Sequence, residues 1–373
     1  MKTGILSIGL VRGLLFQAAG FLAGVAVVTV IRLAFGMGFS AEPAIVLGAF
    51  FSAIGFMIGV GAFSGWFANA LGKPAIPPEE VEEPSGFKRY LGVSYDHKVI
   101  GVQYGMLTIA ALFLGGSFAL IFRSELVAPG MQLIGLQQFN TLIGLHGMVA
   151  IVGMLLGGAA LGNFLVPLLI GAKDMAFPRL NAFAFWLAVP AVVLVLSSMA
   201  AGGFDTGWTA YPPLSIFANM GMQLFFAGVV VFGWSSVLGA LNIVATVLRM
   251  RAPGMSLFRM PIFVWGSLAT SIIAMTATQL IGLSFQLVMF ERLFGMGFFN
   301  PANGGNPILF QHLFWFYSHP AVYIFVLPGF AVISELLPVF ARKPLFGYRW
   351  VAMSSLGIAL VGFLVWAHHM FTS

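Results

Sequence analysis

Long apolar runs separated by short polar segments dominate the chain. Several runs exceed the roughly 20 residues that a helix needs to cross a bilayer, and they are far longer than the strands of a membrane barrel. Backbone groups inside lipid must be satisfied within helices or closed barrels. We therefore predict an all-α polytopic membrane protein with nine membrane-spanning helices: 11–35, 43–70, 97–123, 137–170, 181–201, 212–248, 261–290, 307–340 and 349–370.

Composition agrees with this pattern, because 60% of the residues are hydrophobic and only 8% are charged, against about a quarter in soluble domains. The clearly polar stretch 72–90 is rich in proline and acidic residues. We predict two extra membrane helices in residues 1–71, a cytoplasmic linker in 72–94 and a core of seven helices in 95–373. No small-residue cleavage site follows the first run, so we expect it to be retained as a helix.

The net charge of +6 follows the membrane topology and does not indicate nucleic-acid binding. With the N-terminus in the cytoplasm, the outer side receives only Arg32, Arg123 and Arg292. The inner side receives 14 basic residues: Lys2, Arg12, Lys73, Lys88, Arg89, Lys98, Lys173, Arg179, Arg249, Arg251, Arg259, Arg342, Lys343 and Arg349. This asymmetry fits the positive-inside rule and predicts the orientation.

Histidines are the main candidates for chemistry, because the chain has no cysteine and hence no thiolate ligand. His97 lies at a predicted helix start, where we expect a solvated or capping role. Ionisable residues within membrane spans are costly and often mark functional sites. A single histidine there can also be a structural hydrogen-bonding residue, but five favour ligands: His146, His312, His319, His368 and His369.

The adjacent pair His368 and His369 points to a metal ion. Neighbouring helical residues project about 100° apart, so both imidazoles can reach one ion beside the helix. Imidazole suits copper, iron or zinc. His319 from another helix would complete a trigonal nitrogen site with one open face. Tyr323 follows four residues later on the same helix face, where a phenol can supply a proton and an electron.

His146 occupies a predicted helix with little side-chain bulk, because glycines stand at positions 144, 147, 153, 157, 158 and 162. These glycines indicate either close helix packing or room for a large flat cofactor with His146 as an axial ligand. Arg123, at the outer end of 97–123, can snorkel to the interface or neutralise the polar edge of a cofactor.

Specific strings run in one order from about Tyr95 to the C-terminus, among them "DHKVIGVQYG", "FRSEL", "GNFLVPLLIGAKDMAFPRLNAFAFW", "TGWTAYPPLS", "RAPGM", "FNPANGGNPILFQHLFWFYSHPAVYIFVLPGF" and "ARKPLFGY…VWAHHM". In these strings the chain resembles subunit I of the heme-copper oxygen reductases, the cytochrome c oxidase family. The resemblance implies that the core helices match helices I–VII of that bundle. It also implies a proton-pumping oxidase that oxidises cytochrome c and reduces oxygen to water.

The resemblance also implies roles for single residues. His146 matches an axial ligand of the low-spin heme. Arg123 matches the arginine that donates a hydrogen bond to the formyl group of heme A. Tyr323 matches a phenol joined covalently to His319. The copper ligands implied are His319, His368 and His369. Trp208 and Trp315 match tryptophans beside the hemes, although each could simply be an interfacial or core aromatic residue.

The family's D-type proton channel has its pattern in Asn163, Asp174 and Asn181, with ten and six residues between them. By itself, Asp174 would be an ordinary loop aspartate. Many members carry a proton-relaying glutamate at the position of Ala321. The chain resembles one branch of the A family in which Tyr317 and Ser318, just before His-Pro, replace that glutamate.

The usual subunit continues for five more helices, which carry the remaining heme ligands and the lysine of a second channel. The resemblance therefore implies low-spin heme A, high-spin heme A and copper, with a further chain or segment completing the sites. Other implied partners are subunit II with a dinuclear copper site, subunit III and an electron donor, cytochrome c or quinol. The expected location is the inner (plasma) membrane of a prokaryote, with several membrane passes.

Other functions remain open from the sequence. A quinol oxidase shares the same core, and donor choice lies mostly outside it. A nitric oxide reductase uses iron at the non-heme site and needs no tyrosine at position 323. A channel or transporter explains histidines within the membrane, but not this set with Tyr323 at helical spacing. A non-catalytic or truncated membrane subunit would explain the missing C-terminal ligands.

Overall fold

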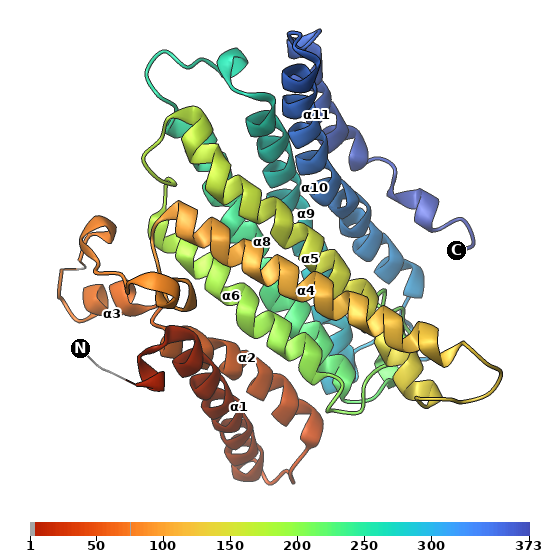
Figure 1. Cartoon of the computed structure of the whole chain (residues 1–373). Helices are drawn as coiled ribbons and strands as arrows, with labels where there is room; N and C mark the ends of the chain where they lie inside the picture. The colour runs from red at the N-terminus through yellow and green to blue at the C-terminus, as the bar shows by residue number, and fades with distance from the viewer. Residues whose placement is uncertain (1–3, 75) are drawn as a thin grey trace.

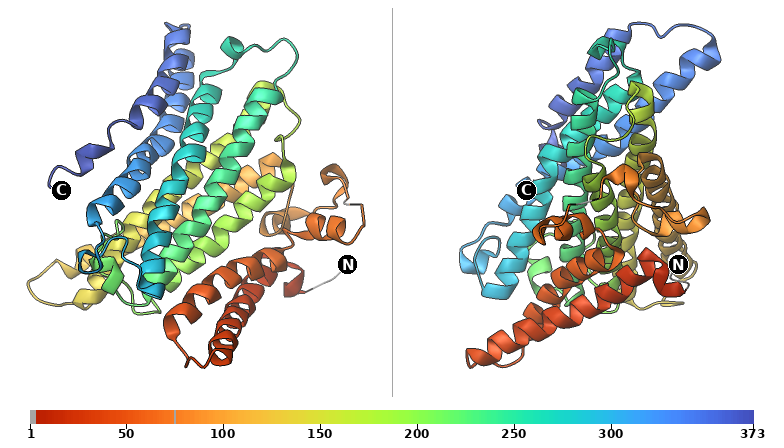
Figure 2. Two further views of the ribbon diagram at one scale, coloured as in Figure 1. Left: turned by 180° about the vertical axis from the view of Figure 1, so that it is seen from behind. Right: turned by 90° about the vertical axis from the view of Figure 1, so that its left-hand side faces the viewer.

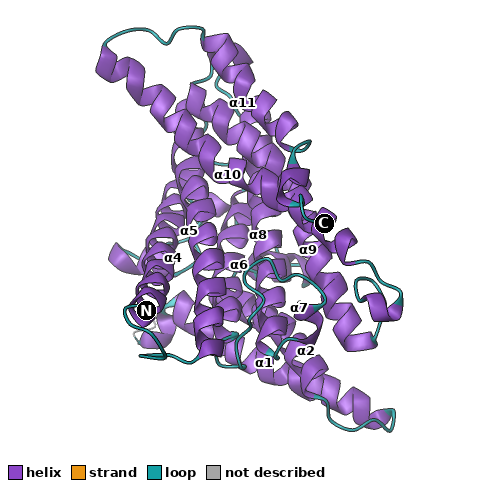
Figure 3. Ribbon diagram, turned by 90° about the vertical axis from the view of Figure 1, so that its right-hand side faces the viewer, coloured by secondary structure: helices purple, strands orange, loops and turns teal. Residues whose placement is uncertain are grey.

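A computed structural model describes residues 4–74 and 76–373. Its described part is helical, with no strand (Figure 3). Within this part, 8 helices are long and apolar enough to cross a membrane. They are α1 (Gly9–Ala34), α2 (Ala41–Val60), α4 (His97–Glu125), α5 (Leu136–Ile170), α6 (Pro178–Ser197), α8 (Gly221–Arg249), α9 (Ile262–Phe294) and α10 (Pro307–Ala341). The prediction of an all-α polytopic membrane protein is confirmed.

The prediction of a ninth continuous span over 349–370 is wrong. Helix α11 (Tyr348–Gly362) has 15 residues, and a separate 3₁₀ turn, η6 (Trp366–His369), follows it. The helix ends at Gly362, where an added Cβ would stand 2.8 Å from two ring carbons of Tyr323, so that only glycine fits this close contact. The chain leaves the helix before it reaches the two histidines.

The predicted span 43–70 is also divided in two. Helix α2 ends at Val60, and the short helix α3 (Ser64–Ala70) follows. Gly61 between them has a φ of +96°, in the left-handed region that glycine adopts without strain. The N-terminal unit is therefore a pair of long helices, α1 and α2, followed by a short surface helix.

The predicted span 212–248 begins later than expected. Pro212 and Pro213 precede a four-residue helix, α7 (Leu214–Phe217), and α8 starts only at Gly221. Proline has no backbone N–H to donate within a helix, so the apolar run before α8 forms a loop and a short helix. This loop contains Tyr211, which contacts Trp315 on α10.

The long helices form one bundle in which neighbours along the chain pack together, α4 on α5, α6 on α8, α8 on α9 and α9 on α10. The hairpin of α1 and α2 lies at one edge of the bundle, against α6 and α8, while α11 and the C-terminal turn lie at the opposite edge (Figures 1 and 2). Between α8, α9 and α10 a core of buried aromatic rings includes Phe225, Phe226, Phe285, Phe310 and Phe314.

Helices α1 and α2 approach closely through glycines. An added Cβ on Gly20 would lie 2.4 Å from the carbonyl oxygen of Phe51, and one on Gly55 would meet the carbonyl oxygen of Phe16. Small residues allow this kind of backbone contact between membrane helices. The hairpin is therefore a tightly packed unit of its own.

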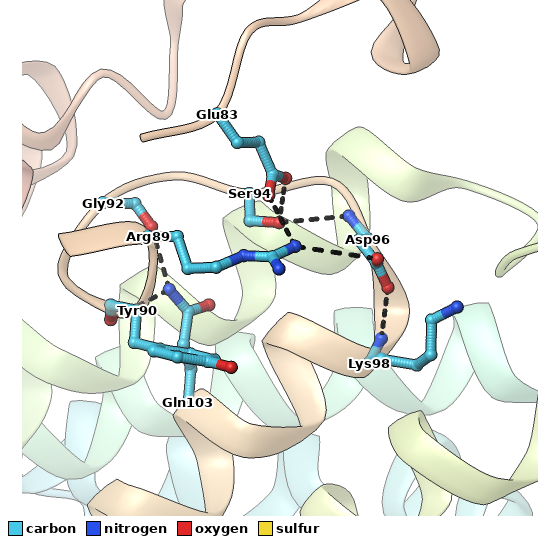
Figure 4. Close-up of polar contacts among 8 residues, drawn as sticks. All are labelled: Glu83, Arg89, Tyr90, Gly92, Ser94, Asp96, Lys98 and Gln103. Atoms are coloured by element: carbon cyan, nitrogen blue, oxygen red, sulfur yellow. Dashed lines mark hydrogen bonds and ion pairs between the residues drawn. The ribbon is translucent and has the colours of Figure 1, made fainter. Parts of the chain in front are cut away.

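The polar linker is fastened to the start of α4 (Figure 4). The carboxylate of Glu83 accepts a hydrogen bond from Arg89 at 3.0 Å and another from the hydroxyl of Ser94. Asp96 caps α4 by accepting the backbone N–H of Lys98 at 2.7 Å. Side-chain caps of this kind satisfy the free N–H groups at the first turn of a helix. These contacts thus hold the end of the linker at the first turn of α4.

Candidate metal centre

Three imidazoles converge between α10 and η6. Candidate ligand atoms of His319, His368 and His369 all lie within 4.8 Å of one another, and Nδ1 of His319 is 3.0 Å from Nε2 of His369. The described residues add no carboxylate to this group. A set of donors made only of imidazole nitrogen suits copper, zinc or iron and disfavours magnesium or calcium. The predicted ligand trio is therefore brought together by the fold.

The two adjacent histidines lie beyond the end of α11. Both belong to the 3₁₀ turn η6 and not to a continuous α-helix. Their ring centroids are 4.2 Å apart, and the ring of His368 lies 4.4 Å from that of His319. The sequence identified the residues, but their conformation differs from the helix that we predicted.

Two aromatic residues hold the imidazoles in place. The indole of Trp315 stacks on His369, with centroids 3.8 Å apart and planes only 3° from parallel. The hydroxyl of Tyr323 lies 2.8 Å from Nε2 of His319. Since that nitrogen faces the phenol, Nδ1 is the atom of His319 that faces the other histidines. Contacts of this kind fix the orientation of metal-ligating rings.

Tyr211 is a site residue that sequence reasoning missed. Its hydroxyl accepts a hydrogen bond from the indole N–H of Trp315, and burial raises the pKa of this phenol. The Tyr211 hydroxyl is therefore placed to hold Trp315 against His369. The string "TGWTAYPPLS", which contains Tyr211, was the available signal, but nothing in its spacing indicated a contact with Trp315.

A cavity of about 170 Å³ adjoins His369 and is mostly apolar. Its walls include His369, Trp315 and Ala321, and its polar groups come mainly from Tyr317, Ser318 and Thr278. Trp208, the other predicted tryptophan, also lines it. Tyr317 and Ser318 are both buried, and the Ser318 hydroxyl has no partner within the described part of the chain. Tyr317 and Ser318 are thus two polar side chains that line a mostly apolar space.

His146 has its own environment on α5. Its Nδ1 lies 2.8 Å from the carbonyl oxygen of Gly115, so Nδ1 carries the proton of that hydrogen bond and Nε2 remains for a ligand. The ring edge of Phe122 packs on the imidazole. Arg123 is exposed at the end of α4. His146 and Arg123 do not belong to the group formed by His319, His368 and His369.

The three residues of the predicted proton channel lie around the ends of α5 and α6. Asn163 is 2% exposed and Asn181 is fully buried, yet Oδ1 of Asn163 and both amide atoms of Asn181 lack partners in the described chain. A cavity of about 70 Å³ begins at Asn163 and is lined by Tyr104, Ser235, Ser236, Ser267, Thr270 and Ser271 among others. Its hydroxyl groups and its volume allow it to hold ordered water.

Asp174 is half-buried in the loop between α5 and α6. Its carboxylate accepts the backbone N–H of Met175 at 2.6 Å. Burial raises the pKa of this carboxyl, and the hydrogen bond from Met175 opposes part of that effect. A carboxyl group with a raised pKa releases its proton closer to neutral pH.

The prediction that His97 is solvated or caps a helix is wrong. The side chain is 1% exposed, and its Nδ1 lies 2.8 Å from the carbonyl oxygen of Asn163. Asp96 acts as the cap in its place, which leaves the imidazole free to turn inward. His97 therefore joins α4 to α5 beside the first residue of the predicted proton channel.

Comparison with known proteins decides the family of this chain. The model of the family "Cytochrome C and Quinol oxidase polypeptide I" matches residues 99–373. The chain belongs to this family. The match covers α4 to η6 and hence the metal centre, while the hairpin of α1 and α2 lies outside the matched residues.

Relatives in the polypeptide I family are similar over the same region. The chain is 49% identical to cytochrome c oxidase subunit 1 of Synechocystis sp. over 286 residues, 76% of this chain and 52% of the relative. It is 45% identical to the subunit 1 of Thermostichus vulcanus over 299 residues, covering 78% and 54%. For the Corynebacterium efficiens protein the identity is 42% over 306 residues, covering 78% and 52%. The chain spans about half the length of these curated relatives.

Proposed function

We propose that this chain supplies part of the catalytic subunit of a proton-pumping terminal oxidase that oxidises cytochrome c and reduces oxygen to water. The observation that carries the proposal is the group of three imidazoles with the Tyr323 hydroxyl 2.8 Å from Nε2 of His319. Membership of the polypeptide I family and the relatives' names support the reaction class.

The donor set fits copper at His319, His368 and His369, since three nitrogen ligands converge and the described residues place no carboxylate among them. His146 fits an axial heme ligand through Nε2, because Nδ1 is bonded to the Gly115 carbonyl. When bound, copper and heme would supply electron transfer and oxygen binding. We further propose heme A at both heme sites, with Arg123, Trp208 and Trp315 beside them.

The chain's own residues divide the remaining work. Tyr323 holds a proton at its hydroxyl and orients His319. Asp174 takes protons from water, and the polar groups at Asn163 and Asn181 pass them inward. Tyr317 and Ser318 hand them across the cavity beside His369. The residues that complete the heme sites would come from a further chain or segment, and subunits II and III would complete the complex.

Oxygen uptake and metal content test the proposed function together. The assembled complex should contain copper and heme and should consume oxygen with cytochrome c as the donor. Uptake with quinol alone would indicate a quinol oxidase. Iron without copper at the non-heme site would favour a nitric oxide reductase, and a complex with no heme absorbance would contradict an oxidase of either kind.

Changing Tyr317 to phenylalanine is expected to slow oxygen turnover by about tenfold or more, because the cavity loses a hydroxyl that can relay protons. Heme content should not change, since the ring that fills the wall of the cavity is retained. Tyr348→Phe, away from both cavities, is the control for loss of a hydrogen-bonded phenol. Full turnover in the Tyr317 variant would contradict the assignment of this residue.

Changing Asp174 to asparagine is expected to lower turnover at neutral pH by about tenfold or more, because an amide cannot bind and release the incoming proton. The free energy of unfolding, unlike turnover, should not fall in this variant at neutral pH. Burial raises the Asp174 pKa above 3.8, so the stabilising effect of the protonated form is present below that pH and is lost as pH rises through the native value. At pH 7 the variant should be at least as stable as the parent.

Oxygen uptake and thermal unfolding, both measured from pH 4 to 8, check these two expectations. Asp205→Asn is the matched control, since Asp205 is an exposed loop carboxylate between α6 and α7. Equal turnover in the Asp174 and Asp205 variants would remove Asp174 from the pathway.

A further inference from the structure

An ion pair with a buried guanidinium joins the N-terminal hairpin to the core. Glu42, in the first turn of α2, accepts hydrogen bonds from Nε of Arg292 and, at 2.7 Å, from Nε2 of Gln223. Arg292 lies in the last turn of α9, and its side chain is only 4% exposed. A guanidinium in such a place needs its counter-charge, because an unpaired buried charge is strongly unfavourable. The hairpin provides that counter-charge.

The other side of the same guanidinium holds the loop that precedes α8. One terminal nitrogen of Arg292 donates to the carbonyl oxygens of Ser215 and Ala218, at 2.8 and 2.9 Å. The backbone N–H of Ser215 in turn donates to the carbonyl of Tyr211 at 3.2 Å. Arg292 thus fixes the turn that begins at Tyr211, while Glu42 fixes Arg292.

Tyr211 connects this turn to the metal centre. Its hydroxyl accepts the indole N–H of Trp315, and that indole stacks on the ring of His369 at 3.8 Å. Trp208, three residues earlier, also contacts Trp315 edge to face. A continuous series of direct contacts therefore leads from Glu42 to a candidate metal ligand.

We propose that Glu42 is a positioning residue and that the N-terminal hairpin orders residues 206–218 over the metal centre through the Glu42–Arg292 pair. The hairpin lies outside the matched family region, whereas the three histidines lie inside it. The effect on turnover rests on the proposed function. The ordering of the loop does not.

A second contact of the hairpin provides a matched control. Nε2 of Gln17 on α1 donates to the carbonyl oxygen of Pro190 on α6 at 3.3 Å. Gln17 is buried, and its contact also connects the hairpin to the core. It touches neither Arg292 nor the loop. Gln17→Leu therefore weakens hairpin docking without affecting the counter-charge of Arg292.

Hydrogen exchange on the assembled complex tests the proposal. Glu42→Gln should accelerate exchange of the Ser215 and Ile216 amides by about tenfold or more, while Gln17→Leu should leave them near the parent rate. The oxidase kcat should fall in the Glu42 variant, with the KM for its donor unchanged. Equal effects of both variants, or unchanged exchange in Glu42→Gln, would overturn the proposal.

Glu42→Asp covers the case in which Glu42→Gln does not assemble. The aspartate keeps the charge but shortens the reach to Arg292, so exchange of the Ser215 amide should be faster than in the parent complex. A parental exchange rate would overturn the proposal. Copper content of the parent complex separates the two hypotheses. Absence of copper contradicts the proposed function, whereas the exchange result still decides whether Glu42 orders the loop.

Discussion

Replacing His319 with alanine is expected to remove copper from the assembled complex and to lower oxygen reduction by more than about a hundredfold. His319 is one of the three histidines that we propose as copper ligands, and of these three it is the one on α10. Two histidines on a short turn cannot hold the ion in the same way, and Tyr323 loses the nitrogen that it contacts. The absorbance of a heme bound at His146 should persist.

His312→Ala is the matched control for this variant. His312 lies on the same helix, two turns earlier, and accepts a hydrogen bond from the indole of Trp366 at 3.2 Å. It should change copper content little. Copper measured by atomic absorption, beside heme spectra of the same samples, gives the result, and full copper occupancy in His319→Ala would contradict the assigned site.

Replacing Tyr323 with phenylalanine is expected to have a comparable effect on turnover with a different signature. Turnover should fall by about a hundredfold or more, because the hydroxyl that can supply a proton next to His319 is lost. Copper should remain, since the three imidazoles are unchanged. The separation of copper content from activity distinguishes a proton donor from a ligand.

Tyr348→Phe provides the comparison for Tyr323→Phe. The Tyr348 hydroxyl is also hydrogen-bonded, to the indole of Trp265 and the carbonyl of Met260, but it lies at the other end of α11. Its loss should affect stability more than turnover. Active Tyr323→Phe with a normal copper content would show that the phenol is not needed for the reaction.

The helical content and the ligand trio were accessible from the sequence because they depend on local patterns. Apolar runs set the helices, and the spacing of His319 and Tyr323 placed both on one face of a helix. Whether these residues carry the assigned roles stays a prediction, but the fold brings them within contact. The geometry of the pair His368 and His369 was not accessible, because it depends on where α11 ends.

Contacts between distant segments account for the other differences. Tyr211 and Trp315 are 104 residues apart, and Glu42 and Arg292 are 250 apart. No periodicity within one helix reports such pairs. His97 was misjudged for the same reason: a histidine at a helix start has the same local sequence whether it faces water or, as here, the carbonyl of Asn163.

The geometry of the candidate metal centre depends on the close contact between Gly362 and the ring of Tyr323. Because the ring of Tyr323 occupies the place of a side chain at this position, the backbone of α11 rests directly on the residue that contacts His319. The spacing between α11 and α10, and with it the spacing between the two parts of the proposed ligand set, thus depends on the contact of this backbone with one edge of the Tyr323 ring. A single methyl group at position 362 would push α11 away from the Tyr323 ring on α10 and so separate the two parts of the ligand set. It would touch none of the three histidines.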